Sequence, residues 1–147
     1  MTDELRVLIV DDSQGVREQL RTLYRELGHR VVGECGNGLK AIELVRELSP
    51  DLVSLDIIMP EMDGIEAYRI LRHLENPPRC LIVSALGSEP RVLAAYEREI
   101  LPTHYCAKPV TRELLSEKIA AVMADTPMPL PALLDNDAAE QDEGIGT

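Results

Sequence analysis

The feature that most constrains the fold is an alternation between two apolar periods along the chain. Short apolar runs typical of β-strands occur at 5–10, 31–35, 52–55, 80–84 and 104–107. Between them, apolar residues recur three or four positions apart, as on one face of an α-helix. Strands that alternate with helices pair in parallel, with the helices covering both faces. The chain is therefore predicted to be an α/β protein with a doubly wound, five-stranded parallel sheet.

Five helices are expected between and after these strands. The first places Val16, Leu20, Leu23 and Leu27 on one face and begins after Ser13, a good N-cap residue. The next two show their apolar faces at 41–48 and 67–74. The fourth is expected at 88–100, with a proline that is tolerable in the first turn, and the fifth at 111–124.

Length and composition indicate one globular domain, predicted to span residues 1–124. The 147 residues are 45% hydrophobic, enough to bury a core. The formal net charge of −11, from 15 basic and 26 acidic residues, argues against nucleic acid or an anionic membrane as the partner. No apolar stretch approaches the length of a membrane-spanning helix, and the N-terminus lacks the pattern of a signal peptide. We expect a soluble, cytoplasmic protein.

Residues 125–147 differ in composition from the rest of the chain. They contain three prolines, six acidic residues and no basic residue. Such a segment is predicted to be a disordered acidic tail, although its apolar stretch "LPALL" leaves a docking peptide open.

The three cysteines lie in apolar segments without metal-type spacing. We expect Cys35, Cys80 and Cys106 to be buried, reduced thiols. The three histidines are scattered along the chain and have no ligand or base partner nearby in the sequence.

Polar residues stand at the ends of four of the five predicted strands. Asp11 and Asp12 follow the first, Asp56 follows the third, Ser84 ends the fourth and Lys108 follows the fifth. The carboxyl ends of parallel strands meet at one edge of the sheet, which is where such folds bind ligands. The five side chains are therefore predicted to converge on one site.

Charge balance suggests what this site can hold. Three carboxylates at one edge repel one another unless cations compensate them, and one lysine with one divalent cation would neutralise the set. All-oxygen ligands favour Mg²⁺ or Mn²⁺ over zinc. Such a cation and Lys108 would attract a phosphoryl group, for which Asp56 is a plausible nucleophile.

From residue 5 to about 123 the chain resembles the receiver domain of two-component response regulators. The resemblance is carried by "VDDS" after the first strand, "LDIIMPEMDG" after the third, "VSA" after the fourth and "KP" after the fifth. Each motif is short, but their order and their placement at strand ends are specific in combination. Three longer stretches resemble the chemotaxis branch of this family: "VVGECGNG", "LSPDLVSLDIIMPEMDGIEA" and "IVSALG".

The resemblance implies a (βα)5 flavodoxin-like receiver fold and a role for each residue of the site. Asp56 would accept phosphate from a phosphohistidine. Asp12, Asp56 and the main-chain carbonyl of Ile58 would bind Mg²⁺, and Asp11 would do so through water. Lys108 would contact the phosphoryl oxygens.

The resemblance also implies a switch. Ser84 would hydrogen-bond the phosphoryl group, and Tyr105 would then swing from solvent into the space that Ser84 leaves. The surface formed by the fourth helix, the fifth strand and the fifth helix would change. A cis bond is expected between Lys108 and Pro109.

As a member of this family the chain would be a signalling protein and not an enzyme, apart from its own phosphorylation and dephosphorylation. Its partners would be a sensor histidine kinase or a histidine phosphotransfer protein, together with a downstream protein target. A monomer is expected, and dimerisation on phosphorylation stays open. A phosphorelay intermediate that passes its phosphate to a histidine phosphotransfer protein, or a receiver that is part of a longer regulator, is the alternative function.

Other classes of protein fit the sequence less well. A haloacid-dehalogenase-like phosphatase would need a DxD pattern after the first strand, and "VDDSQ" does not supply it. In a flavodoxin-like nucleotide binder, Asp11 and Asp12 would repel the phosphate. A degenerate receiver that acts only by docking would not need the intact set of site residues.

A basic stripe on the first helix allows two interpretations. Arg17, Arg21 and Arg25 recur every four residues and so share one face. The stripe is either a docking surface for the phosphohistidine donor or an ordinary solvated face.

Overall fold

A five-stranded, fully parallel sheet forms the centre of the molecule. The computed structural model describes residues 4–59, 64–85 and 104–124. The strands are β1 (Arg6–Val10), β2 (Arg30–Cys35), β3 (Leu52–Leu55), β4 (Arg79–Ser84) and β5 (Tyr105–Ala107). They lie in the order β2-β1-β3-β4-β5, and each pair of neighbours is parallel. The predicted fold class is confirmed.

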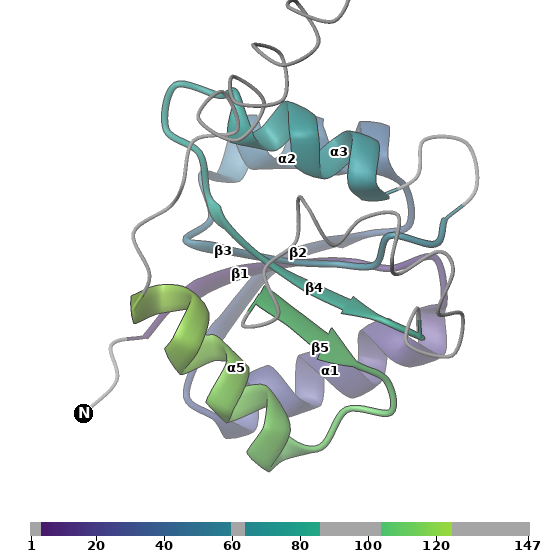
Figure 1. Cartoon of the computed structure of the whole chain (residues 1–147), viewed down its shortest axis with the longest axis vertical. Coiled ribbons are helices and arrows are strands. Elements are labelled where there is room, and N and C mark those ends of the chain that lie inside the picture. The colour runs from purple at the N-terminus through teal and green to yellow at the C-terminus, as the bar shows by residue number, and fades with distance from the viewer. Residues whose placement is uncertain (1–3, 60–63, 86–103, 125–147) are drawn as a thin grey trace, which may run out of the picture.

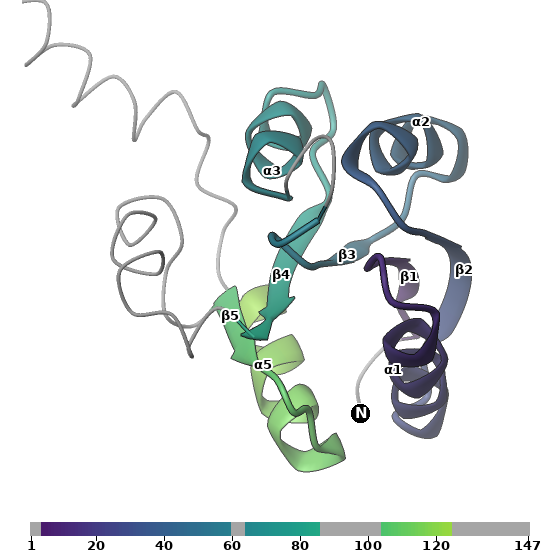
Figure 2. The same ribbon diagram turned by 90° about the vertical axis from the view of Figure 1, so that its right-hand side faces the viewer.

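Helices cover both faces of the sheet. The described helices are α1 (Gln14–Glu26), α2 (Gly38–Leu48), α3 (Gly64–Arg72) and α5 (Arg112–Ala124). Figure 1 shows α2 and α3 on one face and α1 and α5 on the other, and Figure 2 shows the same layers from the side. This is the doubly wound arrangement that the alternating pattern predicts.

The sequence marks both ends of α1. The side chain of Ser13 accepts a hydrogen bond of 3.3 Å from the amide of Val16, so Ser13 is the N-cap. At the other end Gly28 has a φ of 89°, in the left-handed region that glycine adopts without steric cost. The next residue, His29, is buried, and its Nδ1 accepts a hydrogen bond from the amide of Leu5.

Two apolar clusters form the core, one on each face of the sheet. The first lies under α2 and α3 and includes Leu8, Val10, Ala41, Val45, Val53, Leu55, Ile65, Tyr68, Leu71 and Ile82. The second lies under α1 and α5 and includes Val7, Ile9, Leu20, Tyr24, Leu52, Leu81, Val83, Leu115, Ile119 and Val122. Neighbouring residues of a strand enter opposite clusters because side chains alternate between the faces of a sheet.

The register of the sheet brings the strand ends together. Val10, the last residue of β1, pairs with Leu55 at the end of β3 and with Cys35 at the end of β2. Ser84, at the end of β4, pairs with Ala107 at the end of β5. The residues that follow these positions therefore meet at one edge.

The strands begin and end within one residue of the predicted bounds. The prediction of buried, free cysteines is also confirmed at all three positions. The helix predicted at 88–100 and the acidic tail at 125–147 lie outside the described residues, and the domain boundary after residue 124 stays a prediction. Within the described ranges, no helix is long and apolar enough to cross a bilayer.

Candidate functional site

Three aspartates meet at the carboxyl edge of the sheet. Asp11 and Asp12 follow β1 and Asp56 follows β3, and one carboxylate oxygen from each lies within 4.8 Å of the others. Asp11 and Asp56 are buried, with 1% and 5% of their surface exposed, whereas Asp12 is exposed. The three aspartates thus converge as their strand-end positions predict, and the structure adds that two of the carboxylates are buried and the third faces solvent.

Lys108 joins the two buried carboxylates. Its Nζ lies 2.7 Å from Asp11 Oδ2 and 3.1 Å from Asp56 Oδ2. The main chain of Lys108 is held as well, because its amide donates to the carbonyl of Ser84 at 3.0 Å. The expected cis bond between Lys108 and Pro109 is present.

Burial and charge act against each other at this lysine. Burial disfavours the ammonium and lowers the pKa of Lys108, but the hydrogen bond to Asp11 and the charges of Asp56 and Asp11 outweigh burial and raise the pKa overall. Burial raises the pKa of Asp11, and the hydrogen bond from Lys108 offsets only part of that rise. Lys108 is therefore a fixed positive charge within the cluster.

The second carboxylate oxygen of Asp56 accepts two hydrogen bonds. Asp56 Oδ1 lies 2.8 Å from the Ser84 hydroxyl and 3.0 Å from the amide of Ile58. Ser84 is fully buried, and the Ile58 side chain is 48% exposed beside the site. The structure thus holds Asp56 from β4, from its own loop and from the loop after β5.

Tyr105 lies nearer to the site than the sequence suggests. Its ring is half-buried and packs against the cluster under α2 and α3, and its hydroxyl donates to the Ser84 carbonyl at 3.1 Å. The resemblance placed this ring in solvent before the switch. The Ser84 carbonyl therefore accepts hydrogen bonds from both Tyr105 and Lys108.

Gly64 is a site residue that the sequence reasoning missed. Its amide donates to the Ile57 carbonyl at 3.1 Å, and a Cβ at this position would overlap the main chain of Asp56 and Ile57. Only glycine allows α3 to begin this close to the loop that carries Asp56 and Ile57. Gly64 is the last residue of the motif "LDIIMPEMDG", but its close approach to the main chain of Asp56 and Ile57 arises only in the folded chain.

The basic stripe on α1 is not a uniform exposed surface. Arg17 and Arg21 are half-buried and contact Glu34 of β2, whereas Arg25 is exposed. Arg17 also donates to the main-chain carbonyl of Asp11 at 2.7 Å. The first two members of the stripe are therefore not simply solvated, because each is paired with Glu34, and docking of the phosphohistidine donor on this helix stays a prediction.

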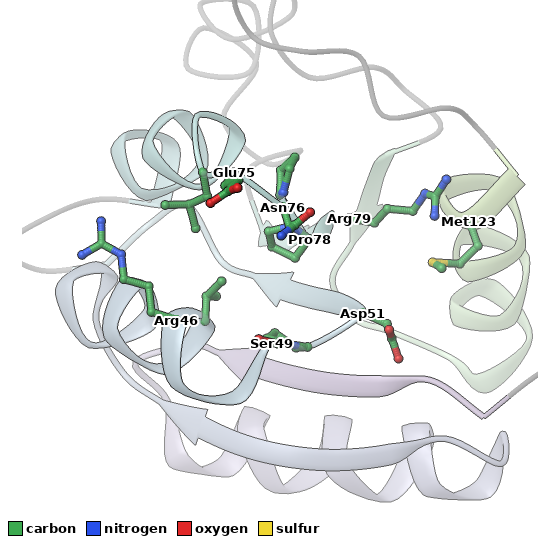
Figure 3. Close-up of a pocket in the computed structure, with 12 residues that line it drawn as sticks. Arg46, Ser49, Asp51, Glu75, Asn76, Pro78, Arg79 and Met123 are labelled. Atoms are coloured by element: carbon green, nitrogen blue, oxygen red, sulfur yellow. The ribbon is translucent and has the colours of Figure 1, made fainter.

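A pocket lies at the opposite edge of the sheet from the acidic site. This pocket of about 570 Å³ is formed by the end of α2, the segment between α3 and β4, and the end of α5. Figure 3 shows Arg46, Asp51, Glu75 and Arg79 along its wall, with Met123 of α5 on the far side. None of the three clustered aspartates lines it, so the pocket is separate from the acidic site.

The geometry of the acidic site defines what it can do chemically. Three carboxylates and one ammonium leave two negative charges, which one divalent cation would neutralise. The donors are all oxygen, the type that hard cations such as Mg²⁺ prefer. Asp56 contacts Lys108 and lies within 4.8 Å of Asp11 and Asp12, so its carboxylate could interact both with a cation and with a phosphoryl group.

Comparison with protein families identifies the chain. Residues 7–120 match the family model described as the response regulator receiver domain. The chain belongs to this family. The receiver family is a signalling family, in agreement with the expectation that the protein is not an enzyme.

Individual relatives support the same assignment. The receiver domain is 40% identical to the chemotaxis protein CheY of Thermotoga maritima over 90 residues, which cover 61% of this chain and 75% of that protein. It is also similar to the crystal structure of the CheX–CheY–BeF3–Mg²⁺ complex from Borrelia burgdorferi, with a TM-score of 0.70, 28% identity and coverage of 80% and 88%. A two-component response regulator of the LuxR family from Aurantimonas gives a TM-score of 0.71 at 32% identity, with coverage of 95% and 99%.

Proposed function

We propose that this receiver domain is a phosphorylation-dependent signalling switch in which Asp56 accepts a phosphoryl group from a phosphohistidine. The donor would be a sensor histidine kinase or a histidine phosphotransfer protein. The observation that carries the proposal is the environment of Asp56: one carboxylate oxygen meets Lys108, the other meets Ser84, and two further aspartates lie within 4.8 Å.

The reaction is an exchange of one bond for another at phosphorus. A carboxylate oxygen of Asp56 attacks the phosphorus atom, the bond between phosphorus and the histidine nitrogen breaks, and the imidazole leaves with the electron pair. Lys108 and the Ser84 hydroxyl, which already contact Asp56, would donate hydrogen bonds to the phosphoryl oxygens as their charge develops.

The same residues fit a divalent cation. Asp12, Asp56 and the Ile58 carbonyl would hold Mg²⁺ directly, and Asp11 would hold it through water; Mn²⁺ has similar ligand preferences. When bound, the cation would neutralise charge on the phosphoryl oxygens. The Borrelia CheY relative, whose complex contains BeF3 and Mg²⁺, supports this assignment.

Tyr105 is the proposed link between the site and the protein surface. Its hydroxyl contacts the carbonyl of Ser84, and the Ser84 hydroxyl contacts Asp56. Movement of Ser84 toward a phosphoryl group would therefore break or redirect the Tyr105 hydrogen bond. The ring would then repack beside β5 and change the surface formed by the segment before β5, β5 itself and α5.

This change shifts a population between two arrangements and does not build a new fold. A shift from 1:99 to 99:1 needs roughly 5.5 kcal/mol of differential interaction. A few charge-assisted hydrogen bonds of about 1.5–3 kcal/mol each supply that energy. The altered surface would control a downstream protein. The CheX–CheY complex of Borrelia supports a protein partner for this kind of domain.

Beryllofluoride, a stable phosphoryl mimic, tests the proposal by NMR. In the presence of Mg²⁺ it should shift the signals of Asp56, Ser84 and Tyr105 in the wild type, and Asp56→Asn should abolish all three changes. Ser84→Ala should keep the change at Asp56 and reduce the change at Tyr105. An equal Tyr105 response in wild type and Ser84→Ala would disprove the coupling, and no response in the wild type would disprove the switch.

A further inference from the structure

We infer that Arg17 is a positioning residue, which fixes the main chain that carries Asp11 and Asp12 so that their carboxylates can hold a divalent cation. The inference rests on the proposed function, because it concerns the same cation site. It assigns to Arg17 a role inside the molecule in place of the surface role that the basic stripe suggests.

The Arg17 guanidinium contacts two elements at once. Its Nη1 donates to the carbonyl oxygen of Asp11 at 2.7 Å, and its Nε lies 3.6 Å from Glu34 Oε1. The side chain is only 21% exposed. A charged donor to a carbonyl makes a hydrogen bond about twice as strong as a neutral one.

Glu34 is itself held in place. It accepts two hydrogen bonds from Arg21, at 2.5 Å and 3.2 Å, and it lies in β2 opposite Ile9 of β1. Arg17 is thus supported by an ion pair whose carboxylate belongs to the sheet. The planar guanidinium keeps a fixed geometry between Glu34 and Asp11, which a lysine ammonium would not reproduce.

The loop that Arg17 contacts is closely packed. The amide of Asp11 donates to the Cys35 carbonyl at 3.0 Å. A Cβ on Gly36 would lie 3.4 Å from Arg17 Nη1, 3.5 Å from Asp12 Cα and 3.6 Å from the Asp11 carbonyl oxygen. The guanidinium, the loop after β1 and the loop after β2 therefore meet around one glycine.

The Asp11 carbonyl controls the direction of Asp12. The carbonyl and the amide of Asp12 belong to one planar peptide group, so a hydrogen bond that orients the carbonyl also orients the start of Asp12. Asp11 lies inside the fold on Lys108, whereas the Asp12 carboxylate is exposed. Arg17 thus limits the positions that the exposed ligand can take relative to the buried one.

Charge and positioning predict opposite effects when Arg17 is replaced. A positive charge beside a cation site repels the cation, so its removal alone should tighten Mg²⁺ binding. Loss of the carbonyl contact should instead weaken binding, since groups that orient metal ligands typically change affinity 10- to 100-fold. The sign of the change therefore separates the two effects.

The experiment compares Arg17→Met with Arg21→Met, which removes a charge from the same helix and the same glutamate but leaves the Asp11 carbonyl contact. Calorimetric titration of the full chain with Mg²⁺ should give about tenfold weaker binding for Arg17→Met. Arg21→Met should bind within about twofold of the wild type or more tightly. In EDTA, the amide signals of Asp12 and Ser13 should shift more in Arg17→Met than in Arg21→Met, because Arg21 supports the Asp11 contact only indirectly, through Glu34.

Equal or tighter binding by Arg17→Met, or unmoved Asp12 and Ser13 amides, would overturn the inference alone. A wild type that binds no Mg²⁺ at millimolar concentration would overturn the proposed cation site as well. If Arg17→Met does not fold, Arg17→Lys decides by the same criteria. This variant keeps the positive charge but loses the planar guanidinium that contacts Asp11 and Glu34 together, so it should also bind Mg²⁺ more weakly than the wild type.

Discussion

Lys108 carries the charge balance of the acidic cluster at the scale of single residues. Its side-chain ammonium contacts both Asp11 and Asp56. These two carboxylates are almost fully buried. A buried carboxylate without a partner either takes up a proton or is rehydrated, and both cost free energy.

We predict that Lys108→Met lowers the free energy of unfolding by about 3 kcal/mol in the absence of divalent cations. This is near the lower end of the cost of removing one partner from a buried pair. Mg²⁺ should restore part of the loss because it replaces the missing positive charge. Denaturant unfolding in EDTA and in Mg²⁺ measures both effects. Lys40→Met, at an exposed position of α2, is the control, and a Lys108→Met variant as stable as this control would contradict the prediction.

His29 makes the stability of the fold depend on pH. Its Nδ1 accepts a hydrogen bond from the Leu5 amide at 3.1 Å, which a protonated ring could not do. Burial lowers the pKa of His29 below its usual 6.5, although Glu4 opposes part of the change. The unfolded state therefore binds the proton more readily, and stability from this residue is complete above pH 6.5 and lost as the pH falls through the lowered pKa.

His29→Asn should reduce this pH dependence, because an amide oxygen can accept the Leu5 hydrogen bond without titrating. The melting temperature should fall less steeply between pH 7.5 and pH 5 for His29→Asn than for the wild type. The exposed His73→Asn should keep the wild-type slope. Parallel slopes for His29→Asn and wild type would show that His29 does not supply the pH dependence.

Side-chain contacts between distant elements were the part of the site that the sequence could not reveal. The strand-end positions of Asp11, Asp56 and Lys108 follow from topology alone, and the structure brings these residues together as predicted. The contact of Arg17 with the Asp11 carbonyl and of Tyr105 with the Ser84 carbonyl depends on rotamers and on packing between elements. Neither contact produces a periodic pattern or a motif that can be recognised in the sequence.

At the scale of elements, periodicity was sufficient where a described segment has one clear apolar face, as α1 does, or is buried on both faces, as β3 is. The four residues of β3 are all buried, as expected of a central parallel strand. In α1, Ser13 and Gly28 mark the ends by side-chain capping and by a left-handed backbone. The tight contact at the start of α3 was not visible, since it depends on how closely the helix approaches the β3 loop.

Gly64→Ala should destabilise the protein by roughly 1–3 kcal/mol, the usual range for overpacking. The added methyl would push against the main chain of Asp56 and Ile57, so the variant should also bind beryllofluoride more weakly. Gly15→Ala is the matched control, because its nearest neighbour would be Ser13 Oγ at 3.9 Å and alanine favours a helix. Equal unfolding free energies for the two variants would show that α3 can move away from the loop at little cost.

At the scale of the whole molecule, the sheet separates two apolar cores and carries the acidic site at its carboxyl edge. Figure 1 shows α2 and α3 packed on one face and α1 and α5 on the other. The two cores bury Asp11 and Asp56 at this edge, and Asp12 stays open to solvent. The fold thus provides a site that is buried on its inner side and accessible on its outer side.

Covalent labelling shows directly whether Asp56 accepts the phosphoryl group. The protein would be incubated with acetyl phosphate and Mg²⁺, its intact mass measured, and the acyl phosphate reduced with borohydride to mark the modified aspartate for peptide mapping. We expect one added phosphoryl group in the wild type and in the control Asp51→Asn, with the mark at Asp56. We expect no label in Asp56→Asn or in the wild type with EDTA. A label of wild-type extent in Asp56→Asn, or a mark at another aspartate of the wild type, would contradict the assignment of Asp56 as the phosphoacceptor.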